Sequence, residues 1–286
     1  MKVSTYKVPS TKSIRLKDYP TSEGKKEEND HIRENIIPDL VTQMKDLHHR
    51  LHAEEKHGIL VVLQAMDAAG KDEAISYIFS NLSAQGLKTT TLSKPTDEEM
   101  KQDYLRRIQV GLPDRGQIGI LNRSHYEEVI APRIHNTLED GDIPDHADKR
   151  SIWKLRYRQI NDYEKYLNEN GIHIVKFFFH MSKDEQKDRL LERMKNREKH
   201  WEFSFSDIEE REYWDDYQKV FEEMLNHTST SYCPWYVLPA DDEWHSRRLV
   251  TEIMIELMEK LDPKYPTYTG EDLKRLKKEI KKLENE

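Results

Sequence analysis

Short segments with strand character alternate with longer amphipathic segments along most of the chain. Five of the short segments predict strands, at residues 59–63, 88–93, 117–121, 172–179 and 235–238. The continuous apolar character of 59–63 and 172–179 is typical of parallel strands that helices cover on both faces. Because strands that alternate with helices connect through right-handed crossovers, the pattern predicts an α/β domain of three layers around a five-stranded parallel sheet.

The amphipathic segments predict the helices between these strands. Apolar residues three and four apart indicate helices at 31–57, 71–84, 97–110, 149–168, 183–197, 206–226 and 243–261, and an isolated charged helix at 271–286. Residues 1–30 are polar and aperiodic, which predicts a largely extended arm. Pro263 and Pro266 mark the end of the main domain. We therefore divide the chain into an N-terminal arm and helix (1–54), the α/β domain (55–262) and a C-terminal helical extension (263–286).

Charge and composition narrow the class of protein. The 286 residues include 46 Lys and Arg against 54 Asp and Glu, a formal net charge of −8. This balance argues against general nucleic-acid binding but leaves room for a local basic channel. No stretch reaches the roughly 18 apolar residues of a membrane span, and the start of the chain lacks the apolar core of a signal peptide. The single cysteine, Cys233, excludes an internal disulfide, so we expect a cytoplasmic protein without a membrane partner.

The first candidate for chemistry is the segment Gln64-Ala65-Met66-Asp67-Ala68-Ala69-Gly70-Lys71-Asp72, between a predicted strand and a predicted helix. In that context small residues let backbone N–H groups approach phosphate oxygens, and the helix N-terminus adds partial positive charge. Lys71 would add a full charge. The segment departs from GxxxxGK[ST], because Ala65 replaces the first Gly and Asp72 replaces the hydroxyl residue that binds Mg²⁺. Asp67 is then the natural Mg²⁺ ligand, although a plain strand-to-helix turn with a surface Lys remains open.

The second candidate, Asn122-Arg123-Ser124-His125-Tyr126-Glu127, follows the third predicted strand. It opens at the same carboxyl edge of the sheet as the first segment, which is where doubly wound sheets bind ligands. Arg123 can clamp a phosphate through two hydrogen bonds, and Asn122 can orient a phosphate or a water molecule. A polar loop with Tyr126 packed inward is the alternative interpretation.

The third candidate is the charged helix after the fourth predicted strand. Its bases include Lys187, Arg189 and Arg193, and the two arginines share a face because they are four residues apart. A solvated helix with internal ion pairs is the usual explanation for such a run. Its position, however, is where nucleotide-kinase-like folds carry a lid with phosphate-clamping arginines.

Other residues favour structural roles. His48, His49 and His52 lack a Cys or acidic partner at metal-ligand spacing. We interpret Trp201, Trp214, Trp235 and Trp244 as core or lid packing rather than as base-stacking platforms.

Taken together, these segments resemble the polyphosphate kinase 2 family. The resemblance runs from about Leu60 to Asp262. It rests on the two loop segments above, on Lys94-Pro95-Thr96, on the run from Lys176 to Gln186, on Lys199-His200-Trp201, and on the run from Pro234 to Asp241.

The resemblance implies a thymidylate-kinase-like P-loop fold with a helical lid at about 183–212. It implies reversible, Mg²⁺-dependent transfer of a terminal phosphoryl group from inorganic polyphosphate to a nucleotide, with Mn²⁺ as a substitute ion. By position, Asp67, Lys71, Arg123 and Arg193 would be catalytic, with Asp67 as the metal ligand. Further positions would bind phosphate or nucleotide: Ala68, Ala69, Gly70, Asp72, Lys94, Arg107, Asn122, Glu127, Arg133, Lys187 and Arg189.

Two finer expectations come from the same resemblance. The form His125-Tyr126-Glu127 is similar to the subgroup that phosphorylates both AMP and ADP. We also expect a homo-oligomer, either a dimer or a tetramer. Two other functions remain open: an ATP-dependent kinase for a nucleotide or small metabolite, and a non-catalytic phosphate-binding protein.

Overall fold

The computed structural model describes residues 3–23, 28–92, 95–138 and 151–286. Within them lies one sheet of five parallel strands in the order β2-β3-β1-β4-β5. The strands are β1 (Gly58–Ala65), β2 (Leu87–Thr91), β3 (Ile118–Asn122), β4 (Ile172–His180) and β5 (Trp235–Pro239). Each overlaps the segment predicted for it, so the predicted α/β class is confirmed.

Strand β1 lies at the centre of the sheet and directs its carboxyl end toward the candidate site. Its residues from Gly58 to Gln64 are all buried, as a strand covered on both faces requires. Leu63 pairs with Asn122 at the end of β3, and Ala65 pairs with Phe179 near the end of β4. The loops that follow β1, β3 and β4 therefore leave the sheet from one edge.

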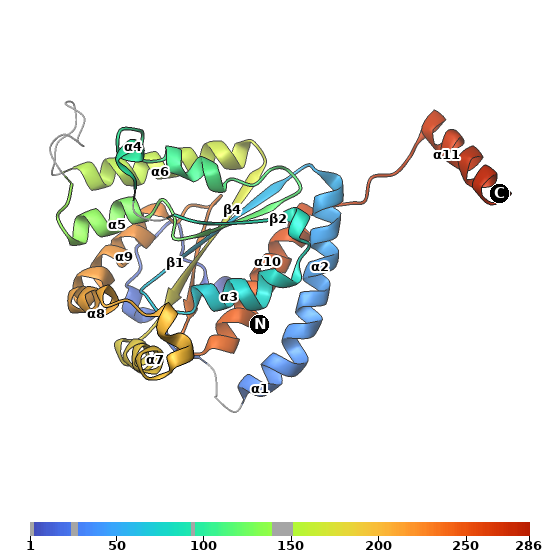
Figure 1. Cartoon of the computed structure of the whole chain (residues 1–286). Coiled ribbons are helices and arrows are strands. Elements are labelled where there is room, and N and C mark those ends of the chain that lie inside the picture. Colours follow the sequence, from blue (N-terminus) through green and yellow to red (C-terminus); the bar gives the residue numbers. More distant parts are fainter. Residues whose placement is uncertain (1–2, 24–27, 93–94, 139–150) are drawn as a thin grey trace.

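Helices cover both faces of the sheet (Figure 1). One layer contains α2 (Ile37–Glu54), α3 (Lys71–Ile78) and α10 (Glu243–Leu261), in which α10 packs against the other two. The opposite layer contains α5 (Glu127–Ile134), α6 (Ile152–Glu169) and α9 (Trp214–Thr228), in which α9 packs against the other two. Two further helices, α7 (Lys183–Lys195) and α8 (Ser206–Glu210), stand beyond the carboxyl edge of the sheet.

Several predicted helices are shorter than their apolar pattern suggested. The prediction of one helix at 97–110 is wrong: α4 (Asp97–Met100) ends early, and a 3-10 helix forms at Arg106–Gly111. A capping box at Thr96 starts α4, and the Asp103 carboxylate then accepts the Leu105 N–H, a local bond that competes with the helix. The helix predicted at 71–84 likewise ends at Ile78, and 3-10 turns follow it.

The remaining differences concern one split helix and one that was not predicted. The segment 206–226 divides into α8 and α9 around the 3-10 turn Arg211–Tyr213. Helix α5 was not predicted, because it has eight residues and carries Pro132 inside. The helix predicted from residue 31 begins with α1 (Asn29–His31) and passes through the π-helical turn Ile32–Ile36 into α2.

The N-terminal arm belongs to the main core. Val3, Tyr6, Val8 and Leu16 are buried in the same cluster as the sheet. The Val8 N–H donates to the Trp235 carbonyl at 2.9 Å, so the arm covers the free edge of β5. The expectation of a largely extended arm missed this packing, because the spacing of its apolar residues follows neither the helical nor the strand period.

The C-terminal helix α11 (Gly270–Leu283) stands apart from the body, at the end of the connection after α10 (Figure 1). Leu273, Ile280 and Leu283 are exposed on it. Across the residues that the structure describes, no helix combines the length and the apolar character that a membrane span needs.

Candidate active site

The loop between β1 and α3 has the backbone of an anion-binding turn. Ala68 (φ 64°) and Gly70 (φ 91°) both lie in the left-handed region, and Gly70 is the N-cap of α3. Lys71 is the first residue of the helix, and its Nζ donates to the Met66 carbonyl at 3.2 Å. Backbone N–H groups in such a turn point into one concavity, where the helix N-terminus adds positive potential. The loop thus has the shape and charge that hold a phosphate.

A cavity of about 380 Å³ opens over this loop. Three parts of the chain form its walls: the loop and the first turn of α3, the ends of β2 and β3, and the lid segment, our name for residues 183–212. The lining residues are Asp67, Ala68, Ala69, Gly70, Lys71, Asp72, Glu73, Thr91, Asn122, Arg123, Arg193, Trp201, Glu202, Phe203, Ser204 and Asp207. A volume of this size falls at the lower end of the range for small-ligand sites.

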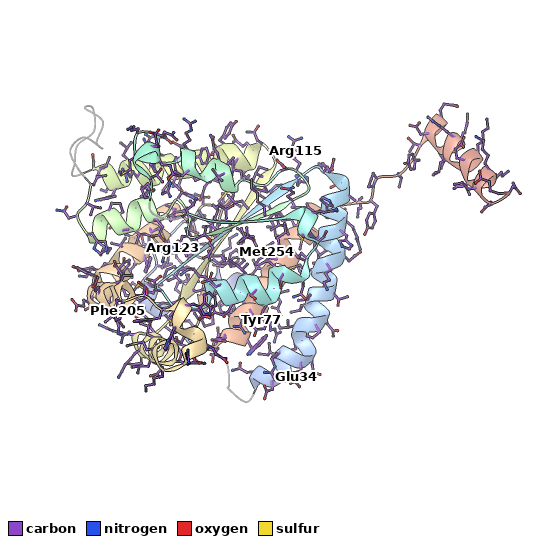
Figure 2. The ribbon with its side chains drawn as sticks, in the orientation of Figure 1. Glu34, Tyr77, Arg115, Arg123, Phe205 and Met254 are labelled. Atoms are coloured by element: carbon purple, nitrogen blue, oxygen red, sulfur yellow. The ribbon has the colours of Figure 1, made fainter. Side chains whose placement is uncertain are left out.

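Arg123 and Asp67 are bonded to each other in the wall of the cavity. The Arg123 Nη2 donates to Asp67 Oδ1 at 3.2 Å. Arg123, which Figure 2 labels, has a left-handed backbone (φ 61°) directly after the end of β3. Burial opposes the positive charge of Arg123, but the carboxylates of Asp67, Glu127 and Asp207 outweigh that effect and raise its pKa. Arg123 is therefore a permanent cation at the mouth of the loop.

Arg189 braces the phosphate-binding loop from behind. Its Nη1 donates to the Ala68 carbonyl at 3.2 Å and its Nη2 to the Ala240 carbonyl at 2.7 Å, while Nε is bound to Glu185 at 2.8 Å. Gln186 adds a bond to the Asp67 carbonyl at 3.1 Å. Arg189 is absent from the cavity lining, so it positions the loop rather than facing the cavity.

Arg193, one turn further along α7, does line the cavity. Its Nη1 donates to the Glu202 carbonyl at 3.2 Å, and its Nη2 lies 3.7 Å from Glu73 Oε1 on α3. Glu73 occupies a position where a negative charge would repel a phosphate. The approach of Arg193 offsets that charge and ties the lid segment to the phosphate-binding helix.

The amide of Asn122 is committed to the loop. Its Nδ2 donates to Asp72 Oδ1 at 2.5 Å, which joins the end of β3 to the first turn of α3. Both residues line the cavity. Asn122 therefore fixes the Asp72 side chain beside Lys71.

Glu127 stands behind Arg123 at the start of α5. Its Oε1 accepts a bond from Gln64 Nε2 at 2.9 Å, and Glu127 is absent from the cavity lining. Burial raises the pKa of Glu127, and the bond from Gln64 and the charges of Arg123 and Lys71 only partly oppose this.

A buried charged network supports the Arg123 loop from the core side. Lys176 on β4 and Glu164 on α6 form an ion pair at 2.5 Å, with side chains 0% and 1% exposed. The Tyr126 hydroxyl donates to Glu164 at 2.7 Å and accepts from Lys176 Nζ at 2.9 Å. His125 Nε2 lies 3.3 Å from the same carboxylate. The side chains of His125 and Tyr126, two and three residues after Arg123, are thus both anchored to Glu164.

The structure does not bring every predicted binding residue to the cavity. Arg107 is buried and bonds to Glu99 and Glu128, and Arg133 pairs with Glu223. Lys187 is exposed on α7. None of these three lines the cavity. Lys94 lies outside the described residues.

Asp67 and Asp207 are two carboxylates of the cavity lining that could hold a divalent ion. Burial and the negative charge of Asp67 raise the pKa of Asp207, and the hydrogen bond from the Ser204 N–H opposes this only in part. A cation between them would relieve this repulsion. Among the described residues no group of three or more His, Cys, Asp and Glu side chains could hold a metal. The residues fit Mg²⁺, which protein sites commonly hold by one or two carboxylates plus substrate phosphates.

Five lid-segment residues of the cavity wall were not predicted as site residues from the sequence. Trp201, Glu202, Phe203, Ser204 and Asp207 lie on the lid segment after α7 and face the loop. The segment Lys199-His200-Trp201 carries part of the family resemblance, but the interpretation of Trp201 as packed in the core or lid is wrong, because its side chain is exposed.

Comparison with known proteins agrees with this geometry. The family model described as polyphosphate kinase 2 (PPK2) matches residues 26–266. The chain is 39% identical over 280 residues to an ADP-polyphosphate phosphotransferase of Rhodopseudomonas palustris, covering 96% of this chain and 97% of that protein. It is 42% identical over 227 residues to an AMP/ADP-polyphosphate phosphotransferase of Meiothermus ruber, covering 79% and 81%.

A solved structure extends the match to three dimensions. The crystal structure of polyphosphate kinase 2 from Arthrobacter aurescens superposes with a TM-score of 0.82 at 32% identity, covering 96% of this chain and 95% of the other. The P-loop kinase fold is therefore confirmed. The chain belongs to the polyphosphate kinase 2 family.

Proposed function

We propose that this protein transfers the terminal phosphoryl group of inorganic polyphosphate to AMP and to ADP, reversibly and with Mg²⁺. The observation that carries the proposal is the meeting of three cations from three elements, Lys71, Arg123 and Arg193, around one phosphate-binding loop. Polyphosphate carries about one negative charge per phosphate, so its end needs such a set of cations. The names of the two relatives above support both acceptors.

The reaction needs little covalent help from the protein. An oxygen of the acceptor phosphate attacks the terminal phosphorus of polyphosphate, and the bond from that phosphorus to the bridging oxygen breaks. The nucleotide gains one phosphate, and the polyphosphate leaves one phosphate shorter. Catalysis then consists of holding the two phosphates in line and stabilising the charge that spreads over the transferring group.

The residues at and around the cavity have separate roles in this proposal. The loop N–H groups and Lys71 hold the transferring phosphoryl group, while Arg123 and Arg193 stabilise its equatorial oxygens. Asn122 and Arg189 keep the loop in shape, since their bonds go to Asp72 and to the Ala68 carbonyl. Asp67 and Asp207 would hold Mg²⁺, or Mn²⁺ in its place, which when bound supplies further charge neutralisation between the phosphates.

Donor choice tests the proposal against an ATP-dependent kinase. Purified protein is incubated with AMP and Mg²⁺, together with either long-chain polyphosphate or ATP, and the nucleotides are separated. We expect ADP and then ATP to form from polyphosphate, and chelation of the metal to stop the reaction. If ADP forms with ATP as the donor but not with polyphosphate, the ATP-dependent kinase is favoured. If no product forms with either donor, a non-catalytic binding protein is favoured.

We further propose that the chain forms a homo-oligomer, a dimer or a tetramer. The exposed Leu273, Ile280 and Leu283 share one side of α11, spaced at seven and three residues. Light scattering on the full chain and on a variant with all three changed to Ser compares the masses directly.

A further inference from the structure

Trp201 combines a cavity position with unusual exposure. Its side chain is 81% exposed, the highest value for any large hydrophobic residue in the part of the chain that the structure describes. It also lines the cavity, with the phosphate-binding loop as the opposite wall. The indole therefore exposes a large apolar surface to solvent at a ligand cavity. Exposed apolar surface of this kind commonly marks a place where a ligand binds.

The backbone that carries Trp201 is tied to the phosphate site. Trp201 lies in the 3-10 helix Arg197–Glu202. The carbonyl of the neighbouring Glu202 accepts a bond from Arg193 Nη1 (3.2 Å), and the Glu202 carboxylate forms an ion pair with Arg193 Nε (3.4 Å). Arg193 reaches in turn to Glu73 on α3. An aromatic surface and a phosphate-binding cation are thus presented together by one short segment.

We propose that Trp201 is the stacking platform for the base of the acceptor nucleotide. This inference rests on the proposed function and names the part of the substrate that the indole recognises. Polyphosphate has no aromatic group, whereas every nucleobase has a flat face that stacks on an aromatic side chain. The loop wall offers charged and small residues, which suit phosphates, and the lid wall offers Trp201 and Phe203.

Stacking predicts a tolerant base subsite. A π-face is common to adenine and guanine, so an indole platform binds both bases, unlike a site built from base-edge hydrogen bonds. We therefore expect AMP and GMP to lose affinity by similar factors when the indole is removed.

The test compares Trp201→Ala with Phe205→Ala. Phe205 is a matched control because it is 79% exposed and four residues further along the same segment, yet it is absent from the cavity lining (Figure 2). Both positions are exposed, so neither change should affect folding. In Trp201→Ala we expect the KM for AMP to rise roughly 5- to 150-fold, while the KM for polyphosphate stays within about twofold. Trp201→Phe should restore most of the loss, and Phe205→Ala should resemble wild type.

A binding measurement separates the base from the phosphate. Calorimetric titration with AMP and with ribose 5-phosphate, which lacks the base, gives Kd for each variant. We expect Trp201→Ala to weaken AMP alone. Equal weakening of both ligands, an unchanged Kd for AMP, or the same loss in Phe205→Ala would overturn the assignment. Wild-type protein that makes no product from polyphosphate would instead refute the proposed function and leave the AMP titration as the separate test of Trp201.

Discussion

Arg123 donates to Asp67 across 3.2 Å and so joins the loop after β1 to the loop after β3. The other two cations of the cavity are also satisfied by the protein: Lys71 by the Met66 carbonyl and Arg193 by Glu202. The protein thus keeps its cations in place at little cost in reorganisation, which is the condition for strong electrostatic catalysis.

Replacement of Lys71 by Ala tests the central cation. Its side chain donates to a loop carbonyl and is not part of the buried core, so we expect folding to be nearly unchanged. Turnover should fall by roughly 10²-fold or more, the usual effect of removing one transition-state contact of this kind. Steady-state kinetics measure it, with the exposed Lys195→Ala as a control for loss of one surface charge. Retention of more than about a tenth of the activity would remove Lys71 from this role.

Helix α7 offers a comparison between two positive charges. Arg193 lines the cavity, whereas Lys187 is exposed outside it. We expect Arg193→Ala to raise the KM for polyphosphate strongly and Lys187→Ala to leave it near the wild-type value. Arg189→Ala should also weaken polyphosphate use, because the loop loses its brace at the Ala68 carbonyl.

The salt dependence adds a second measurement on the same helix. Wild-type affinity for polyphosphate should fall steeply with ionic strength, since several charges are screened together. Arg193→Ala should show a shallower fall. Unchanged kinetics in Arg193→Ala would leave α7 as an ordinary solvated helix.

Glu127 is the residue through which we test acceptor choice. It bonds to Gln64 and adjoins Arg123, so its removal should alter how the acceptor phosphate is held. AMP has one phosphate fewer than ADP through which the protein can bind it. We therefore expect Glu127→Asn to lose more activity with AMP than with ADP. The ratio of kcat/KM for AMP and ADP, in this variant and in wild type, is the measurement. A similar fall for both acceptors would limit Glu127 to a structural pairing.

The buried pair of Lys176 and Glu164 should dominate local stability. Lys176→Met leaves the Glu164 carboxylate buried without its main partner, a change that typically costs about 3–5 kcal/mol. The double variant Lys176→Met/Glu164→Gln should recover part of this, because no buried charge remains. Urea unfolding measures both. Equal stability of the single and double variants would show that the loss does not arise from an unpaired charge.

The same pair predicts a pH dependence. Burial raises the pKa of Glu164, but Lys176 and His125 more than offset it, so the folded-state pKa lies below the ordinary value. The unfolded chain then binds the proton more readily than the folded chain. This contribution to stability is present above the ordinary carboxyl pKa of about 4.3 and is lost as the pH falls through the folded-state pKa. Glu164→Gln should flatten that acid limb of the unfolding curve.

The sheet and the phosphate-binding loop could be predicted because their signals are local. A continuous apolar run such as Ile59 to Leu63 is required wherever helices cover both faces of a strand. Small residues followed by Lys71 are likewise a local requirement of a phosphate-binding turn. Helix α5 lacked such a signal, since Pro132 lies within its eight residues.

The long-range contacts of the site could not be predicted in this way. Lys176 stands in the apolar run of β4, and its burial depends on Glu164, which comes from helix α6. Arg107 and Arg133 have the charge of phosphate ligands, but their carboxylate partners lie far along the chain or in other elements. The exposure of Trp201 follows from the path of the lid segment, which no periodicity records.

The most direct test of the account is a ³¹P NMR time course of AMP, polyphosphate and Mg²⁺ with the purified protein. We predict that polyphosphate signal is lost in step with the growth of the ADP and ATP phosphate signals, with no matching release of inorganic phosphate. Lys71→Ala under the same conditions should leave the spectrum nearly unchanged. Polyphosphate that persists beside unreacted AMP, or that is converted to inorganic phosphate alone, would contradict the claim that this cavity transfers phosphoryl groups from polyphosphate to nucleotides.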